Sequence, residues 1–217
     1  MLDAQFAIAT RVRLYLDLPC CTGCCQHRRP DGTVCGAQLD SKGVHARSCP
    51  VGGWLVRRHN AGCAVLADWA EKECDCTVFR EQVLPTANPD HTEARLDIVV
   101  HSPLVASPLY VDLTVVSALS VEALAKGSAL RDGAAAGLAA KDKVSRYPNC
   151  RVWPFPVEDH GRVGDDSMEF VRTIAPKEPA RRSAAIALLY QSLACVLQRS
   201  AADSVIAATT GSSTAAA

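Results

Sequence analysis

Four residues in the first quarter of the chain have types and spacing that suit a metal ion. They are Cys25, Cys35, His45 and Cys49, in the pattern C-x9-C-x9-H-x3-C. Thiolates and imidazoles are the ligands of structural zinc, and an H-x3-C pair supplies two of them from one short segment. The surrounding residues 20–53 lack a sustained hydrophobic period, so a bound ion would supply the ordering energy that a core does not. We therefore predict a structural Zn²⁺ site.

The first two zinc ligands stay open at this point. Cys20, Cys21 and Cys24 lie just upstream, and Cys21-x2-Cys24 is a better-spaced pair than Cys25 with Cys35. His27 is a further, weaker candidate. The chain has 11 cysteines, an odd number, and its N-terminus lacks the basic region and cleavage site of a secretory signal. These features favour metal binding over disulfides.

A second group of residues suits a different metal. Asp97 and Asp112 each interrupt an apolar run, where a charge is costly unless it is paired or binds a cation. Adjacent strands lie about 4.8 Å apart, so the two carboxylates can reach one ion. Carboxylates together with phosphate oxygens suit Mg²⁺, which can assist phosphodiester cleavage. Asp90 is excluded as the first ligand because it lies in a turn-rich stretch, Asn-Pro-Asp-His.

A lysine beside such a site could orient water or neutralise developing charge. Lys141 and Lys143 are both candidates near the end of a helical stretch, and Lys143-x3-Tyr147 puts two side chains on one helix face. Glu81, near the end of the first expected strand, is a possible extra acidic ligand, although a solvent-exposed carboxylate is the alternative that we favour.

The helices and strands that must position these residues are predicted from the periodicity of hydrophobic residues and from the prolines and glycines that interrupt it. Helices are expected at 4–16, 54–74, 118–147, 167–175 and 181–198, and strands at 77–84, 94–101, 109–116 and 151–157. The last strand should lie at a sheet edge because of its prolines. The order after residue 53 is thus α-β-β-β-α-β, which predicts an α/β layer fold around a small mixed sheet.

The amino-acid composition limits the classes of protein to which this chain can belong. The chain has 217 residues, of which 48% are hydrophobic and 21% charged, so it can bury a sizeable core. No apolar run reaches the ~18 residues that a membrane-spanning helix needs, and we expect no membrane association. The formal net charge is zero, so an interaction with nucleic acid must rest on a local site. Residues 1–60 carry a local excess of basic residues, which is compatible with a polyanionic partner.

Several short motifs occur in an order that resembles a known family. The chain is similar to the C-terminal region of early-branching non-LTR retrotransposon polyproteins, in which a zinc knuckle precedes a restriction-like endonuclease. The motifs that carry the likeness are Gly43-x-His45-x3-Cys49, Gly52-Gly53, Arg58-His59-Asn60, Asp97-x14-Asp112, Lys143-x3-Tyr147 and the stretch 151–161. The opening residues 6–19 resemble the segment that follows the reverse transcriptase.

The resemblance implies a fold class: α/β, a restriction-endonuclease-like (PD-(D/E)xK) mixed sheet flanked by helices, preceded by a small zinc knuckle. It implies Mg²⁺ (or Mn²⁺) bound by Asp97 and Asp112, with Lys143 as the relocated catalytic lysine. Leu96 stands where the family has proline, and Thr114 stands where the superfold commonly has lysine. The expected organisation is an N-terminal helix at 1–19, a zinc knuckle at 20–53, a nuclease domain at 54–198 and a disordered tail at 199–217.

By the same resemblance, the expected function is that of a metal-dependent DNA endonuclease that nicks target DNA to prime reverse transcription. Its partners would be DNA, element RNA and, if the chain is a fragment, a reverse transcriptase domain, which the sequence does not contain. Nuclear localisation is implied in the same way. Two alternatives stay open: a catalytically inert nucleic-acid-binding module, and a zinc-stabilised interaction domain. Arg47, Arg57 and Arg58 are candidate phosphate contacts.

Overall fold

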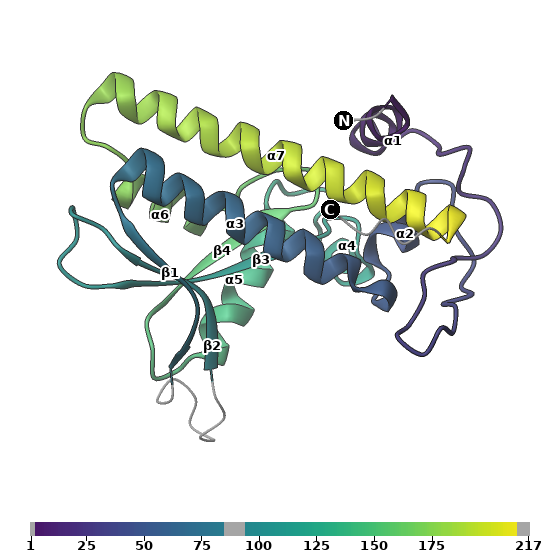
Figure 1. Cartoon of the computed structure of the whole chain (residues 1–217), viewed down its shortest axis with the longest axis horizontal. Helices are drawn as coiled ribbons and strands as arrows, with labels where there is room; N and C mark the ends of the chain where they lie inside the picture. The colour runs from purple at the N-terminus through teal and green to yellow at the C-terminus, as the bar shows by residue number, and fades with distance from the viewer. Residues whose placement is uncertain (1–2, 85–93, 212–217) are drawn as a thin grey trace. The chain divides into compact units, whose positions relative to one another are not determined.

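The computed structural model describes residues 3–84 and 94–211 (Figure 1). The elements in chain order are α1 (Asp3–Arg13), α2 (Val44–Ser48), the 3-10 turn η1 (Val51–Gly53), α3 (Trp54–Cys74), β1 (Thr77–Leu84), β2 (Ala94–His101), β3 (Leu109–Val116), α4 (Val121–Ala125), α5 (Ala134–Arg146), β4 (Val152–Glu158), α6 (Asp165–Ile174) and α7 (Pro179–Thr210). The described part of the chain contains no helix with the length and apolar character needed to cross a bilayer.

The four strands form one mixed sheet in the order β1-β2-β3-β4. The β1–β2 and β2–β3 pairs are antiparallel, and β3–β4 is parallel. The parallel pair requires a crossover, which α4 and α5 provide. β4 lies at the sheet edge as its two prolines require, because proline cannot donate to a strand ladder. The predicted mixed α/β sheet flanked by helices is thus confirmed.

Helices cover both faces of this sheet. Leu113 lies on one face, where a Cβ added to Gly62 in α3 would lie 3.4 Å from its side chain. Asp112 alternates to the other face and meets α5. Figure 1 shows α5 against β3 and β4, and α6 also packs on β4 through Phe155 and Phe170.

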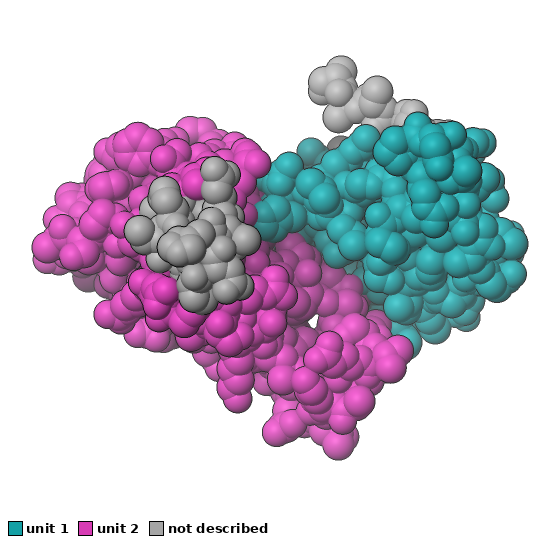
Figure 2. Space-filling view, turned by 90° about the horizontal axis from the view of Figure 1, so that it is seen from below, with its two compact units in different colours: residues 1–60, 195–217 teal, residues 61–194 magenta. Residues whose placement is uncertain are grey.

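The structure divides the chain into two compact units, coloured teal and magenta in Figure 2. Unit 1 comprises residues 1–60 and 195–217, and unit 2 comprises 61–194. This division differs from the expected one. The residues of the N-terminal helix and the zinc knuckle belong to one unit with the end of the chain, and the boundaries fall inside α3 and α7.

The expectation of a disordered tail from residue 199 is wrong for residues 199–210. Helix α7 continues to Thr210, and Ala201, Ala202, Val205 and Ala208 are fully buried. Val205 and Ala208 share a core with residues of α1 and the cysteine-rich segment. An Ala-rich stretch of low complexity becomes ordered here because it supplies the apolar surface that unit 1 otherwise lacks. Residues 212–217 lie outside the described part.

The single helix expected at 118–147 is two helices. α4 ends at Ala125, and α5 begins only at Ala134. Gly127 and Gly133 between them have φ values of +87° and +69°, a left-handed conformation that ends a right-handed helix.

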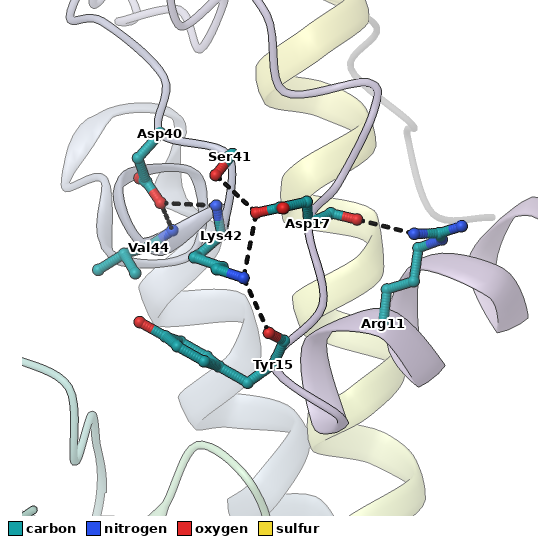
Figure 3. Close-up of polar contacts among 7 residues, drawn as sticks. All are labelled: Arg11, Tyr15, Asp17, Asp40, Ser41, Lys42 and Val44. Carbon is teal, nitrogen blue, oxygen red and sulfur yellow. Dashed lines mark hydrogen bonds and ion pairs between the residues drawn. The ribbon is translucent and has the colours of Figure 1, made fainter.

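The segment after α1 is tied to the cysteine-rich loop by a polar network (Figure 3). The Lys42 ammonium lies 3.1 Å from a carboxylate oxygen of Asp17 and donates to the carbonyl of Tyr15. Ser41 donates to the same Asp17 carboxylate, and Arg11 donates to the Asp17 carbonyl. The hydrogen bonds from Ser41 and Lys42 lower the pKa of Asp17. The chain from α1 to the loop is thereby a continuous part of unit 1.

Candidate functional site

The sulfur and nitrogen atoms of Cys25, Cys35, His45 and Cys49 converge in unit 1, all within 4.8 Å of one another. The Sγ atoms of Cys25 and Cys49 are 3.9 Å apart and those of Cys35 and Cys49 are 3.6 Å apart; Cys35 Sγ lies 3.5 Å from His45 Nε2. Zn–S bonds of about 2.3 Å in a tetrahedron put sulfurs roughly 3.8 Å apart. The quartet can therefore hold a metal ion such as zinc, and all cysteines are free thiols.

Local backbone geometry brings these ligands together. The Cys25 amide donates to the Ala37 carbonyl and the Gly36 amide donates to the Cys25 carbonyl, so Cys25 and Cys35 face each other across a tight turn. Gly36, directly after Cys35, has a φ of +70°, a left-handed conformation that glycine adopts without strain. His45 and Cys49 come from α2 and its C-terminal cap.

The helix that carries His45 is anchored by Asp40. Its carboxylate accepts hydrogen bonds from the amides of Lys42, Val44 and His45, at 2.8–3.1 Å. Burial opposes ionisation of this carboxyl, but the backbone hydrogen bonds from His45 and Val44 outweigh it and lower its pKa. Asp40 thereby fixes the position of His45 in the quartet.

Thiol protonation in the quartet depends on burial. Burial raises the pKa of the Cys49 thiol to about 12 and also raises that of Cys25. A backbone hydrogen bond from Ala37 lowers the pKa of Cys35. Because a metal ligand must be a thiolate, a cation in the quartet would release protons from the two buried thiols.

The remaining candidates from the cysteine-rich segment lie outside the quartet. Cys20 and Cys24 are exposed and Cys21 is buried beside Cys20. His27 is buried, and its Nε2 lies 3.0 Å from the carbonyl of Ser204 in α7. The pattern C-x9-C-x9-H-x3-C is thus the set that the fold brings together.

Asp97 and Asp112 meet in unit 2 at the point where β2 and β3 stop pairing. The β2–β3 ladder ends at Ile98 and Val111, and one further step of this antiparallel register pairs Asp97 with Asp112. In place of a ladder bond, the Asp97 carboxylate accepts a hydrogen bond of 2.8 Å from the Leu113 amide. The two carboxylates therefore lie next to each other because the strands diverge there.

Asp112 is also held from α5. The Lys143 ammonium lies 2.5 Å from Asp112 Oδ1, and the Tyr147 hydroxyl donates to Oδ2 at 2.9 Å. Lys141, the alternative lysine, is exposed. Lys143 and Tyr147 are four residues apart, so both reach Asp112 from one face of the helix.

The electrostatics of Asp112 are those of a crowded, buried carboxyl. Burial raises its pKa, Lys143 opposes this, and the adjacent Asp97 carboxylate raises it further. The Tyr147 pKa is raised by burial and by the Asp112 charge.

An open cleft of about 780 Å³ borders this site. Its wall includes Thr114, two residues beyond Asp112 on the same strand, and Lys143. Lys126 and Arg146 also line it, but each is paired with an acidic residue one helical turn away. The cleft thus reaches Lys143, the partner of Asp112.

Other predicted residues fall elsewhere. Glu81 is exposed, has a φ of +54° at a position that the β1–β2 ladder skips, and forms an ion pair with Arg95. Arg47 and Arg58 are buried, which excludes them as phosphate contacts, whereas Arg57 is exposed. Asp90 lies outside the described residues.

Sequence reasoning missed Glu158. This carboxylate is buried at the end of β4, and its Oε1 lies 3.4 Å from the Ala136 amide in the first turn of α5. It helps to fix the helix that carries Lys143. A carboxylate after an apolar strand was the available signal, but only the parallel pairing of β3 with β4 shows what it contacts.

No family model matches the chain, and no curated protein matches its sequence.

Proposed function

We propose that unit 2 is a metal-dependent DNA endonuclease of the restriction-like PD-(D/E)xK type, and that the chain derives from a non-LTR retrotransposon. The observation that carries the proposal is the meeting of Asp97 and Asp112 on diverging strands with Lys143 on the crossover helix. The α-β-β-β-α-β order and the mixed sheet are consistent with this class.

The residues have separable roles in this proposal. Asp97 and Asp112 would hold Mg²⁺, which when bound would activate water and stabilise the leaving oxygen. In this proposal Lys143, which forms an ion pair with Asp112, would donate to a phosphate oxygen or to the attacking water once a cation shares Asp112. Tyr147 holds Oδ2 of Asp112 and so orients this carboxylate. The Cys/His quartet in unit 1 would act as a structural zinc site.

The test is nicking of supercoiled plasmid by the full chain with Mg²⁺ and with EDTA. We expect Mg²⁺-dependent nicking that the Asp97→Ala/Asp112→Ala double variant loses while it keeps its fold and zinc. Equal nicking by the double variant would overturn the proposal.

One observation favours a second candidate, an inert nucleic-acid-binding module. Asp112 is satisfied within the chain, because Lys143 and Tyr147 occupy both of its oxygens. Such a module would bind DNA in a salt-dependent way without Mg²⁺-dependent cleavage. Nicking by the wild-type chain, lost in the double variant, would exclude it.

A further inference from the structure

Unit 1 contains a second feature that the zinc quartet does not use: a cavity of about 260 Å³ beside the start of α3. It is lined by Gln26, His27, Arg28, Gly52, Trp54, Arg57, Ala207 and Gly211. Ligand pockets begin at about 300 Å³, so this cavity lies just below that range and can take at most one small ligand. No acidic residue lines it, and two arginines do.

The lining of the cavity includes a buried imidazole, that of His27. His27 is 2% exposed, and its Nδ1 has no hydrogen-bond partner among the described residues. Its Nε2 faces the Ser204 carbonyl at 3.0 Å and must carry the proton to bond it. Nδ1 is then an acceptor, and a buried acceptor without a donor is costly. A ligand with an N–H group would satisfy it.

The same wall offers aromatic surface and positive charge. The Trp54 ring stacks with His27 at a centroid distance of 6.1 Å and an interplanar angle of 25°. The Arg57 guanidinium lies 4.7 Å from the Trp54 ring centroid. Arg57 and Arg28 are both exposed and give the opening a charge that attracts anions.

The pocket is open because of a glycine. Gly52 has a φ of +85°, and a Cβ there would lie 3.2 Å from Cδ1 of Trp54 and 3.5 Å from Cβ of His27. A side chain at this position would press on the Trp54 ring.

From these observations we infer that the cavity binds one nucleotide of a nucleic-acid strand. The base would lie by Trp54 and His27, and the phosphate would lie at Arg28 and Arg57. A planar group with N–H donors that carries an anion is the ligand class that matches an aromatic wall, an imidazole acceptor and two guanidinium groups. The inference concerns unit 1 alone and does not depend on cleavage by unit 2.

The test is calorimetric titration of the zinc-loaded full chain with AMP, CMP, GMP and UMP, with ribose 5-phosphate and inorganic phosphate as base-free probes. We expect at least one nucleotide to bind ten-fold or more tightly than either base-free probe. Equal binding of nucleotide and ribose 5-phosphate, or no binding of any probe, would overturn the inference.

Single substitutions of the two arginines test whether the nucleotide binds in this cavity. Arg28→Ala and Arg57→Ala should each weaken nucleotide binding five-fold or more, because both remove an exposed cation at the opening. Arg29→Ala is the matched control: it is exposed and adjacent, but it does not line the cavity. An equal loss in Arg29→Ala would indicate general charge attraction and would contradict the assignment.

Two further measurements separate the sources of the ligand. In ¹⁵N spectra, the His27 Nδ1 resonance should shift on addition of nucleotide but not of inorganic phosphate; an unchanged resonance would count against the base position.

Single-stranded ten-nucleotide homopolymers should compete with the bound mononucleotide if the pocket takes a nucleotide from a strand. Failure of every homopolymer to compete would overturn the strand assignment. The Asp97→Ala/Asp112→Ala variant should bind as the wild type does.

Discussion

Lys143 and Asp112, 31 residues apart in the chain, form an ion pair with the ammonium nitrogen 2.5 Å from Oδ1. The Asp112 side chain is 4% exposed and that of Lys143 is 17% exposed. The pair joins the centre of the sheet to its crossover helix. It also leaves Asp112 next to Asp97, which is the arrangement on which the proposed nuclease activity depends.

Removal of the lysine should cost both stability and activity. In Lys143→Ala, Asp112 stays buried without its counter-charge, so the free energy of unfolding should fall by roughly 1–3 kcal/mol, less than for a fully buried pair. Any Mg²⁺-dependent nicking should fall by about 100-fold or more. Urea unfolding and plasmid nicking measure the two effects. Lys141→Ala is the control, because Lys141 is exposed, and an equal loss there would reject the assignment of Lys143.

Zinc content should depend on the quartet and not on the neighbouring cysteines. His45→Ala and Cys49→Ser should lose the bound ion and unfold the cysteine-rich segment, because the ion supplies its ordering energy. Cys24→Ser should keep one zinc per chain, since Cys24 is exposed and outside the quartet. Zinc analysis of the purified variants, with circular dichroism before and after chelation, tests this. Retention of zinc by Cys49→Ser would exclude the proposed ligand set.

A glycine next to the quartet should not tolerate a side chain. Gly43 has a φ of +64°, and a Cβ there would lie 2.6 Å from Leu18 Cδ1 in the core of unit 1. Gly43→Ala should therefore destabilise by roughly 2–4 kcal/mol, from backbone strain and overpacking together. Gly23 has a φ of +80° with open space around it, so Gly23→Ala should cost only the strain of about 1–2 kcal/mol. Thermal unfolding of the zinc-loaded variants should show a larger loss of stability for Gly43→Ala than for Gly23→Ala. Equal losses of stability would show that the Leu18 side chain moves aside without an energetic cost.

Stability should fall at alkaline pH because of buried thiols in unit 2. Burial, with a contribution from the Asp97 charge, raises the pKa of Cys63 from 9.0 to about 12. Between these values the unfolded chain has lost a proton that the folded chain keeps, so stability decreases as pH rises from about 9 to about 12. Cys63→Ala should reduce this slope by up to about 1.4 kcal/mol per pH unit. Urea unfolding at several pH values measures it.

The control for this slope is Cys195→Ala, because Cys195 is exposed. Its slope should equal that of the wild type. A Cys63→Ala slope indistinguishable from the wild-type slope would contradict the shifted pKa.

Much of the sheet could be predicted from local pattern. The strands at 77–84, 94–101 and 109–116 and the helix at 54–74 have the predicted bounds. Apolar β-branched runs bounded by prolines, and a helical period over 21 residues, are signals within single segments. The spacing of Cys25, Cys35, His45 and Cys49 was also a local signal, although it competed with Cys21 and Cys24 until the fold excluded them.

Only the tertiary structure decided which distant residues meet. The end of the β2–β3 ladder sets Asp97 beside Asp112, and the crossover helix selects Lys143 over Lys141. Ala201–Thr210 looks like a frayed tail in sequence, yet it is ordered because its small side chains fill the core of unit 1. The sequence by itself determined the residue types and local segments, since these depend on near neighbours. Pairing, burial and charge environment depend on contacts between residues far apart in the chain, and those only the folded structure specifies.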